Sequence, residues 1–480
     1  MSSGASGEKA VEPVLYGNWR QPARAGLGTL SGAATFVLFV VLVVTVVVNA
    51  SFGLFPAFFT ALVSGVFLVA LVRKDRHGVT LIQRIGEVVM FHRARRKGLT
   101  LYRSGPAGKS PWGTCQLPGV LASTRLGEFA DSWDRRFAVL AMPAVGSYAI
   151  VLGCQPDGAS LVDQDQIDLW VARWGMWLAD LGQEHGLVGA QAVVETTPDT
   201  GTRLRQEIQA NLVEDAPEVA RKVAGEVEMI YPSGTASVQV YIALTYQAAP
   251  RLGAKRRAME EFGADMASRI PGLTASLAGT GAGIVRPLTA GEVRRVVRTA
   301  YDPASQALFD AADLSGQTVD LSWAECGPAG HDVLRDRYYH DSGVSMTWMM
   351  TQAPKGQVQS DLLARLLAPQ KEIWRKRVAL MYRPVDVARA AEIVESDVNA
   401  ARARAANMRR PSAYAQMELR KAERSAQEDI RATVERLAAA TRIQIRPVYG
   451  GQDAAFAAGL PVGIVPLRHS RVSESVRQAL

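Results

Sequence analysis

The chain has 480 residues, a length that suggests about three domains, and 48% of them are hydrophobic while 21% are charged. This balance excludes a disordered or low-complexity protein, because the chain has enough apolar surface to bury a core. The three cysteines, at positions 115, 154 and 326, are too few and too widely spaced for a disulfide framework or a four-ligand zinc site. We expect them to be reduced and buried. The formal net charge of +8 suggests an acidic partner, and its distribution along the chain refines that expectation.

A long apolar segment comes early in the chain. From Ala25 to Val72 there is no Asp, Glu, Lys, Arg or His in 48 consecutive residues. A bilayer core of about 30 Å needs roughly 20 helical residues, so this segment is long enough for two spans. Residues 49–53 supply a break, whereas one uninterrupted helix would be about 72 Å long. A cleaved signal peptide would have a much shorter apolar core. We therefore predict a transmembrane hairpin over residues 25–72.

Basic residues follow the apolar segment. Residues 73–97 carry eight Lys and Arg side chains against two acidic ones, a net charge of +6 that leaves +2 for the rest of the chain. By the positive-inside rule, both the N-terminus and the domain after the hairpin are expected in the cytoplasm, which predicts a multi-pass protein of the cell membrane. Anionic lipid is the expected partner rather than nucleic acid, because lipid headgroups lie beside this segment. The predicted membrane-surface basic cluster consists of Arg73, Lys74, Arg76, Arg84, Arg93, Arg95, Arg96 and Lys97.

Beyond residue 100 the hydrophobic pattern alternates between strand-like and helix-like periods. Phe137–Met142 and Ser147–Cys154 predict a β-hairpin. Apolar residues from Ile167 to Leu181 recur at helical spacing, which predicts a helix packed on a sheet. Thr289–Glu292 has the pattern of a capping box, and Tyr301–Pro303 would end the short helix that it starts. We therefore predict an α+β protein, with an N-terminal two-helix transmembrane hairpin followed by cytoplasmic α/β sandwich domains.

The segment from Asp386 to Leu437 is built almost entirely of helix formers and is interrupted by Pro411. It is compatible with a long helical hairpin, an arm between subunits, or partial disorder. Arg442–Val448 then has the pattern of a strand. The expected division of the chain is an N-terminal cytoplasmic segment at 1–24, the hairpin at 25–72, a basic juxtamembrane segment at 73–100, a first α/β region at 101–305, a second region with the helical arm at 306–465, and a loose tail at 466–480.

Motifs that would carry chemistry are incomplete. Gly105–Ser110 resembles part of a nucleotide-binding P-loop, but the first glycine of that loop would fall at position 103, which is Arg103. Gly279–Gly283 follows a helical stretch and precedes a strand, the reverse of a dinucleotide fingerprint, so we expect a turn there. The six histidines lack metal-ligand spacing, and His340–Ser342 holds triad residue types without a nucleophile elbow. We therefore predict no catalytic residue, no cofactor and no metal site.

Several stretches resemble subunits of secretion machines. Tyr16–Arg20, followed by the charge-free segment, resembles the PrgI-type small membrane subunit of Gram-positive conjugation systems. The runs at 338–339, 344–350 and 379–384 resemble the non-motor N-terminal domain of type IV secretion ATPases, in which a strand, a helix and a second strand occur in that order. The closing motif of that domain, after which the motor would start, is matched by Val448–Gln452, Phe456 and Gly459–Gly463.

The whole chain is most similar, over about residues 11–465, to an actinobacterial family that joins these two modules. This chain departs from the resemblance in one respect. An extra apolar strand would be expected between the Ala/Arg-rich helix and the closing motif, but here Ala422–Glu435 passes almost directly into Leu437–Arg446 without one. The closing subdomain would therefore be abbreviated. The stretches that carry the similarity are Leu101–Gly105, Gln155–Asp165, Val194–Arg203 and Tyr339–Ser345.

This resemblance implies a non-enzymatic inner-membrane subunit of a conjugative or type IV-like secretion system. Such a subunit would dock a separately encoded motor ATPase at the membrane, beside other membrane subunits of the machine. Two alternatives remain open. One is an EccE-like membrane subunit of a type VII secretion system, which also has an N-terminal hairpin and a cytoplasmic domain. The other is a membrane-bound enzyme whose active site is assembled from dispersed residues.

Overall fold

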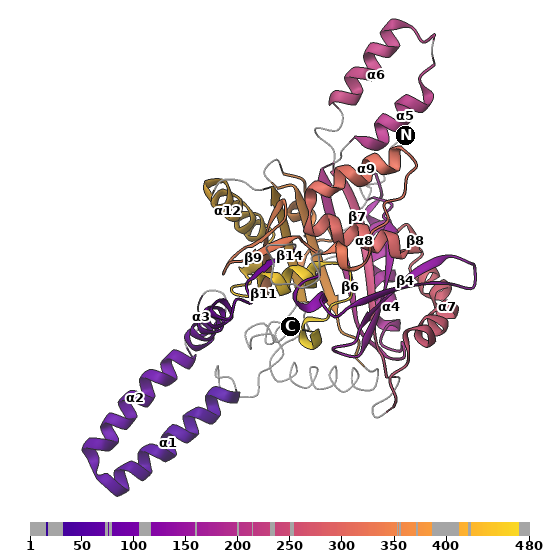
Figure 1. Ribbon diagram of the computed structural model, residues 1–480. Helices are drawn as coiled ribbons and strands as arrows, with labels where there is room; N and C mark the ends of the chain where they lie inside the picture. Colours follow the sequence, from indigo (N-terminus) through magenta and orange to yellow (C-terminus); the bar gives the residue numbers. More distant parts are fainter. Residues whose placement is uncertain are drawn as a thin grey trace, which may run out of the picture.

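The computed structural model describes residues 16–17, 32–72, 75, 79–104, 117–158, 161–198, 201–213, 215–230, 236–249, 254–352, 354, 357–370, 373–385, 412–420 and 424–469. Figure 1 shows a central body with a helical pair at each of two opposite ends, α1 with α2 and α5 with α6. The body consists of one large sheet with helices on both of its faces.

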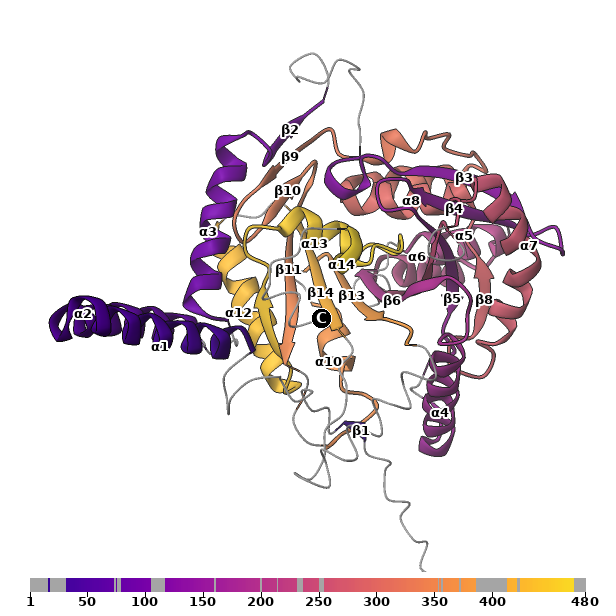
Figure 2. The ribbon, with the colours of Figure 1, turned by 90° about the horizontal axis from the view of Figure 1, so that it is seen from below.

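The first helical pair is made of α1 (Gly32–Phe52) and α2 (Leu54–Val72). Gly53 turns the chain between them with a φ of +86°, a conformation that glycine adopts readily. The two helices lie side by side and away from the sheet (Figures 1 and 2). Within α1, Thr35–Phe52 has a mean hydropathy of 2.5, and α1 is long and apolar enough to cross a membrane. The comparable stretch of α2, Leu54–Val66, is shorter, so α1 is the single candidate span among the described residues.

The sheet contains thirteen strands in the order β2-β9-β10-β11-β14-β13-β6-β7-β5-β4-β3, with β15 also beside β11 and β8 also beside β5. Its strands are β2 (Leu101–Arg103), β3 (Arg125–Ala130), β4 (Arg136–Met142), β5 (Ser147–Gln155), β6 (Leu187–Pro198), β7 (Ala236–Gln247), β8 (Ile284–Pro287), β9 (Gly330–Val333), β10 (Tyr338–His340), β11 (Gly343–Gln352), β13 (Arg375–Tyr382), β14 (Ser412–Arg420) and β15 (Gln444–Pro447). A separate two-stranded ladder pairs β1 (Tyr16–Gly17) with β12 (Gln357–Val358).

Strands from the two expected regions, 101–305 and 306–465, belong to this one sheet. The junction is the antiparallel pairing of β6 with β13, in which Val194 lies opposite Val378. At one edge, β2 pairs with β9, so residues just after the juxtamembrane segment lie beside a strand more than two hundred residues later in the chain. The body is therefore continuous across the two regions through its backbone hydrogen bonds.

Helices cover both faces of the sheet. On one face, α8, α13 and the segment 460–464 pack over a core that includes Val193, Ala379 and Val297. On the other face, α4 and α7 cover the half that contains β5 and β7, while α10 and α12 cover the half that contains β11 and β13. The helices after α2 are α3 (Leu81–Arg96), α4 (Gln164–Asp180), α5 (Thr202–Asn211), α6 (Glu218–Ile230), α7 (Met259–Ala275), α8 (Ala290–Tyr301), α9 (Gln306–Leu314), α10 (Ala364–Leu367), α12 (Arg424–Ala440), α13 (Gln452–Gly459) and α14 (Pro466–His469).

Most locally encoded elements are confirmed. β4 and β5 form the predicted hairpin, with Met142 opposite Ser147. The capping box of α8 is present, because the Thr289 hydroxyl accepts from the Glu292 N–H and the Glu292 carboxylate accepts from the Thr289 N–H. The predicted helix over 167–181 is α4, and the strand, helix and strand expected between 344 and 384 are β11, α10 and β13. Cys154 and Cys326 are free and buried, and position 115 lies outside the described residues.

The prediction for Asp386–Leu437 is wrong in one part. Residues 386–411 lie outside the described residues, but Ser412–Arg420 forms strand β14, which pairs with β11 on one side and β13 on the other. Strand β14 precedes α12, whereas the strand that the sequence lacks would follow the Ala/Arg-rich helix; between α12 and Val448 the described residues contain the predicted strand β15 and no further one. The residues of β14 alternate polar and apolar from Ser412 to Arg420, the period of a strand. Pairing on both sides overrides the helix propensity of its Ala, Met, Glu and Leu residues.

A buried polar and aromatic cluster lies beneath α13. His340 Nδ1 is 2.6 Å from the Tyr301 carbonyl oxygen and His340 Nε2 is 2.7 Å from Ser345 Oγ, while His331 Nδ1 is 3.1 Å from the Tyr338 hydroxyl. Burial lowers the pKa of both histidines to about 4. The triad-type residues do not converge, since the Ser342 hydroxyl donates to Asp302, at 2.5 Å, and not to His340. This cluster is structural.

The body should lose stability in mild acid. Each of these two buried histidines has a pKa of about 4 in the folded protein and about 6.5 in the unfolded chain. The folded protein therefore has its full stability above pH 6.5 and loses stability as the pH falls toward 4, because the unfolded chain binds the protons first. The loss is about 3 kcal/mol per histidine at pH 4. Denaturant titrations of the full chain between pH 7 and pH 4.5 measure it. His340→Gln should remove about half of the pH dependence, and His185→Gln, at an exposed position, should leave it unchanged. An unchanged slope in His340→Gln would assign the acid sensitivity to other groups.

Candidate membrane-surface site

Helix α3 follows α2 in the chain and carries most of the predicted basic cluster that the structure describes. Its start is set by Thr80, whose hydroxyl accepts from the Gln83 N–H while the Gln83 amide oxygen accepts from the Thr80 N–H, at 3.0 Å. Its last turn carries Arg93, Arg95 and Arg96, which favour the negative end of the helix dipole. Local contacts therefore set where this helix begins and favour its C-terminal end.

One face of α3 is buried against the body. The Glu87 carboxylate accepts two hydrogen bonds from the Arg446 guanidinium, at 3.1 and 2.5 Å, and both side chains are 7% exposed. Phe91, one turn farther along, is buried beside Gly450. A Cβ at Gly450 would lie 3.3 Å from the Phe91 Cβ, and its φ of +80° also favours glycine. The Val448–Gln452 part of the closing motif is thus the surface on which α3 is seated.

The closing motif is held in turn by aromatic and amide contacts. The Tyr449 ring lies between the guanidinium groups of Arg335 and Arg446, whose centres are 5.0 and 5.2 Å from the ring centroid. The Gln452 amide bonds both the N–H and the C=O of Thr347 in β11, at 2.8 and 3.1 Å. These contacts fix the loop before α13 onto the sheet, and they give Arg446 a defined position from which to meet α3.

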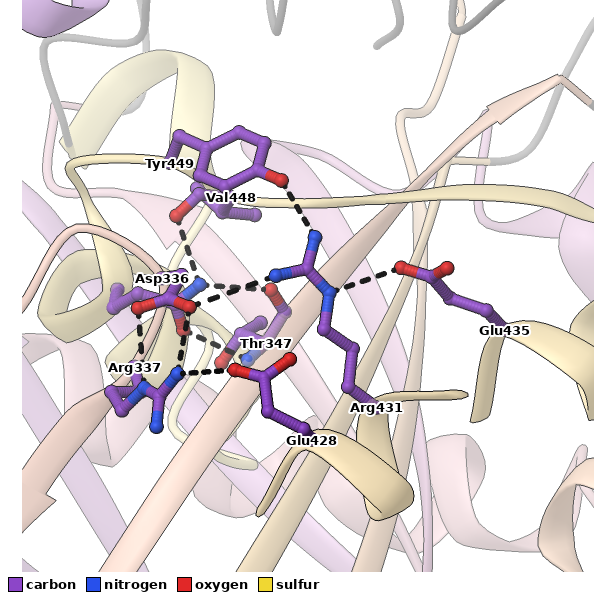
Figure 3. A network of polar contacts seen from close by, with 9 residues as sticks. Asp336, Arg337, Thr347, Glu428, Arg431, Glu435, Val448 and Tyr449 are labelled. Carbon is purple, nitrogen blue, oxygen red and sulfur yellow. Dashed lines mark hydrogen bonds and ion pairs between the residues drawn. The ribbon is translucent and has the colours of Figure 1, made fainter. Parts of the chain in front are cut away.

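An ion network continues from Tyr449 to α12 (Figure 3). Arg431 donates to the Tyr449 hydroxyl at 2.8 Å and pairs with Asp336 and with Glu435. Arg337, in the turn between β9 and β10, bonds Asp336 and Glu428 of α12. The hydrogen bond with Asp336 raises the pKa of Arg337, so that charge persists at all working pH values. Helix α3, the closing motif and α12 are therefore linked through one set of charged contacts.

The rest of α3 is exposed and carries the cations: Arg93 and Arg96 lie on the side away from Glu87, whereas Arg84 and Arg95 lie beside the buried residues in the helical repeat. Arg73, Lys74 and Arg76 of the predicted cluster lie outside the described residues. The other five are exposed, and no ion pair of theirs is found in the described part of the chain: Arg84, Arg93, Arg95, Arg96 and Lys97. The structure thus brings these five onto one helix, and it leaves them available to an external anion.

Apolar side chains share the exposed face of α3 that lies away from Glu87. Leu81, Ile85 and Val89 recur every four residues and are each more than half exposed, and Arg93 follows one turn later. The exposed face is therefore apolar in its first turns and cationic in its last. Figure 2 shows that α3 runs across the direction of α1 and α2 rather than continuing it. The sequence reading noted the cations of this helix but not the apolar residues between them.

A polar groove of about 660 Å³ lies elsewhere, between β5, β6 and β7 and helices α8 and α9. Its arginines pair with acids of the same groove: Arg295 with Asp310 at 3.0 Å, and Arg375 with Glu195 at 3.5 Å. Burial alone would raise the pKa of Glu195, but Arg375 and Arg377 outweigh it and hold that pKa below its usual range. Sequence reasoning missed this cluster because Glu195 and Arg377 are 182 residues apart. The lining holds Arg286, Arg295 and Arg375 against five acids, Glu195, Glu207, Glu292, Asp310 and Asp313, so the groove carries more negative than positive charge and each of its arginines is paired with at least one of these acids.

The described residues include scattered histidines and carboxylates and two buried cysteines. Within them, no group of three or more His, Cys, Asp or Glu side chains is placed to hold a metal ion. Burial raises the pKa of the Cys154 and Cys326 thiols to about 12, so neither is a thiolate at neutral pH. Gly279–Gly283 forms the expected turn between α7 and β8, with positive φ at Gly279, Gly281 and Gly283.

The N-terminal part of the chain is similar to a known protein family. A family model described as a domain of unknown function (DUF8461) matches residues 23–83. The matched part contains α1, α2 and the first residues of α3, and it ends before Glu87. No curated protein matches the chain.

Breaking the pair between α3 and the closing motif should destabilise the body. Glu87→Gln leaves the Arg446 guanidinium buried without its counter-charge, which costs about 3 to 5 kcal/mol of the free energy of unfolding. Denaturant titration of the full chain in detergent measures this loss. Arg95→Ala, at an exposed position of the same helix, should change stability by less than about 0.5 kcal/mol. Adding Arg446→Met to Glu87→Gln should recover part of the loss, and a double variant no more stable than the single one would contradict this account.

Proposed function

We propose that this chain is a membrane-anchored, non-enzymatic subunit of a conjugative or type IV-like secretion machine, and that it holds a docking platform for a separately encoded motor ATPase at the inner membrane. The observation that carries the proposal is the buried joint between α3 and the closing motif. A helix that follows directly on the membrane segment is bonded into the body by a charge pair and an aromatic side chain. Through this joint the platform is fixed to α3, the helix that follows the anchor in the chain.

In this proposal, α1 and α2 cross the membrane as a hairpin, with both termini in the cytoplasm. Helix α2 contains 19 residues, which at 1.5 Å per residue is about the thickness of a bilayer core. Since α3 runs across their direction, it would lie along the membrane surface. Its exposed Leu81, Ile85 and Val89 would enter the interfacial region, while the cations would meet anionic headgroups, each contributing about 1 kcal/mol.

The non-enzymatic part of the proposal rests on two features. Arg103, at the position where a P-loop needs its first glycine, belongs to β2, and its guanidinium donates to the carbonyl oxygens of Tyr102 and His331. The remainder of that loop, residues 105–110, lies outside the described residues. The polar groove, in turn, has arginines that already pair with its own acids. ATP hydrolysis is therefore assigned to a separate chain.

Position 89 should contact lipid. A nitroxide attached to Val89→Cys, in a Cys115→Ser background, should be accessible to oxygen and shielded from a water-soluble nickel chelate when the full chain is reconstituted with anionic lipid. The same label at exposed Val319 should show the opposite accessibility. Arg93→Glu combined with Arg96→Glu should reduce the shielding at position 89. Equal chelate accessibility at positions 89 and 319 would exclude a surface-bound α3.

The docking role is tested by affinity purification of the full chain from gently solubilised membranes, with mass spectrometry of what copurifies. Recovery of a conjugation-type P-loop ATPase supports the proposal, and its loss in Glu87→Gln would link docking to the seated α3. Recovery of type VII components instead would favour the EccE-like alternative. If the membrane complex is intact and contains neither a conjugation-type ATPase nor type VII components, both secretion roles are contradicted. The remaining alternative is then a membrane-bound enzyme with a dispersed active site.

A further inference from the structure

The second helical pair has an exposed apolar stripe. Helices α5 and α6 project from the body at the end opposite to α1 and α2 (Figure 1). On α6, the exposed fraction is 72% at Val219, 52% at Val223, 39% at Val227 and 69% at Ile230. These residues recur at intervals of three and four, so they form one face of the helix. No residue of α6 is buried.

The orientation of this stripe is fixed by α5. On the other side of α6, Glu228 accepts a hydrogen bond from Arg205 of α5 at 2.6 Å. The pair holds α6 with its polar side toward α5 and its valines outward. Thirteen residues of helix with an uncovered stripe are not stable alone in water, so a partner that covers the stripe would stabilise the arm.

Lipid is a poor fit for this stripe. Helix α6 carries Glu218, Glu226 and Glu228 against Arg221 and Lys222, so its net charge is negative, and anionic lipid would repel it. The arm also points away from the candidate membrane helices (Figure 1). The stripe therefore suits another protein helix.

The sequence of α6 is complementary to itself in the antiparallel direction. When two copies cross with a two-fold axis beside Ala224, Val223 faces Val227 of the second copy and Val219 faces Ile230 of the second copy. In the same register Lys222 faces Glu226 of the second copy, on the same flank of the stripe, and symmetry repeats the contact. All three pairs have their midpoints at residues 224–225. One register thus satisfies both the apolar layers and the charges.

We propose that α6 is a self-docking surface, on which two copies of this chain associate through antiparallel α6 helices. The arm would join subunits at the end of the body remote from α1 and α2, leaving the seat of α3 free. The self-complementarity of α6 does not depend on the kind of machine to which the chain belongs.

Reciprocal charge variants test the pairing. Lys222→Glu and Glu226→Lys each place like charges opposite one another across the two-fold axis, so each variant alone should self-associate about tenfold more weakly than the wild-type chain. A mixture of the two, carrying different tags, should copurify with wild-type affinity, because each glutamate then faces a lysine. Charge effects within one α6 helix cannot produce this recovery, since neither chain changes on mixing.

A second variant tests the apolar layers. Val223→Glu places a charge in the stripe and should abolish self-association of the full chain, measured by sedimentation velocity in detergent. Val319→Glu, at an exposed valine outside the arm, should associate like the wild-type chain, and circular dichroism checks that both variants are folded. A monomeric wild-type chain, a Val223→Glu chain that associates normally, or a charge mixture that does not recover would each overturn the proposal.

Discussion

A buried carboxylate needs a counter-charge, and in this chain that requirement joins α3 to the body. Glu87 lies on α3, which follows the apolar segment in the chain, and its partner Arg446 lies on β15, 359 residues later. Leaving either side chain buried without the other would cost several kcal/mol of the free energy of unfolding. The position of α3 therefore follows from the position of β15. The body and α3 thus hold a defined position relative to each other.

The position of β15 depends in turn on the closing motif and on the sheet beneath it. Gln452 bonds both backbone groups of Thr347, and the segment that follows crosses the sheet face. At Gly463 the backbone comes so close that a Cβ would lie 2.6 Å from the Ala149 Cβ, and its carbonyl accepts from the Thr245 hydroxyl at 2.6 Å. The motif thus rests on strands of both regions of the body. The segment that resembles the closing motif of a domain is here also the surface on which α3 packs.

The two ends of the molecule have different surface chemistry. The end near the candidate membrane span has cations and apolar residues on one helix, α3, which suits an anionic interface. The remote end has a valine stripe on α6 flanked by charges of both signs, which suits another helix. Between them, the polar groove has arginines that pair with its own acids, such as Arg375 with Glu195, so its arginines act mainly within the protein. This division fits a subunit whose role is positioning rather than chemistry.

Features that depend on a few neighbouring residues could be read from the sequence. The charge-free segment, the capping box at Thr289 and the hairpin of β4 with β5 are of this kind, because each is decided by side chains within a turn or two. The five described cations of α3 were also found in this way. The same reasoning failed at Ser412–Arg420, where local helix propensity is weaker than strand pairing on both sides.

The sequence by itself determined where the apolar segment and the cations lie, and it located several of the helices and strands. Only the tertiary structure decided that both regions share one sheet, that Glu87 meets Arg446, and that the valines of α6 stay uncovered. The physical reason is the separation along the chain over which each kind of interaction acts. Propensity, capping and charge runs act between residues a few positions apart, whereas sheet register, buried ion pairs and uncovered faces depend on which distant segments are brought together by the packed core.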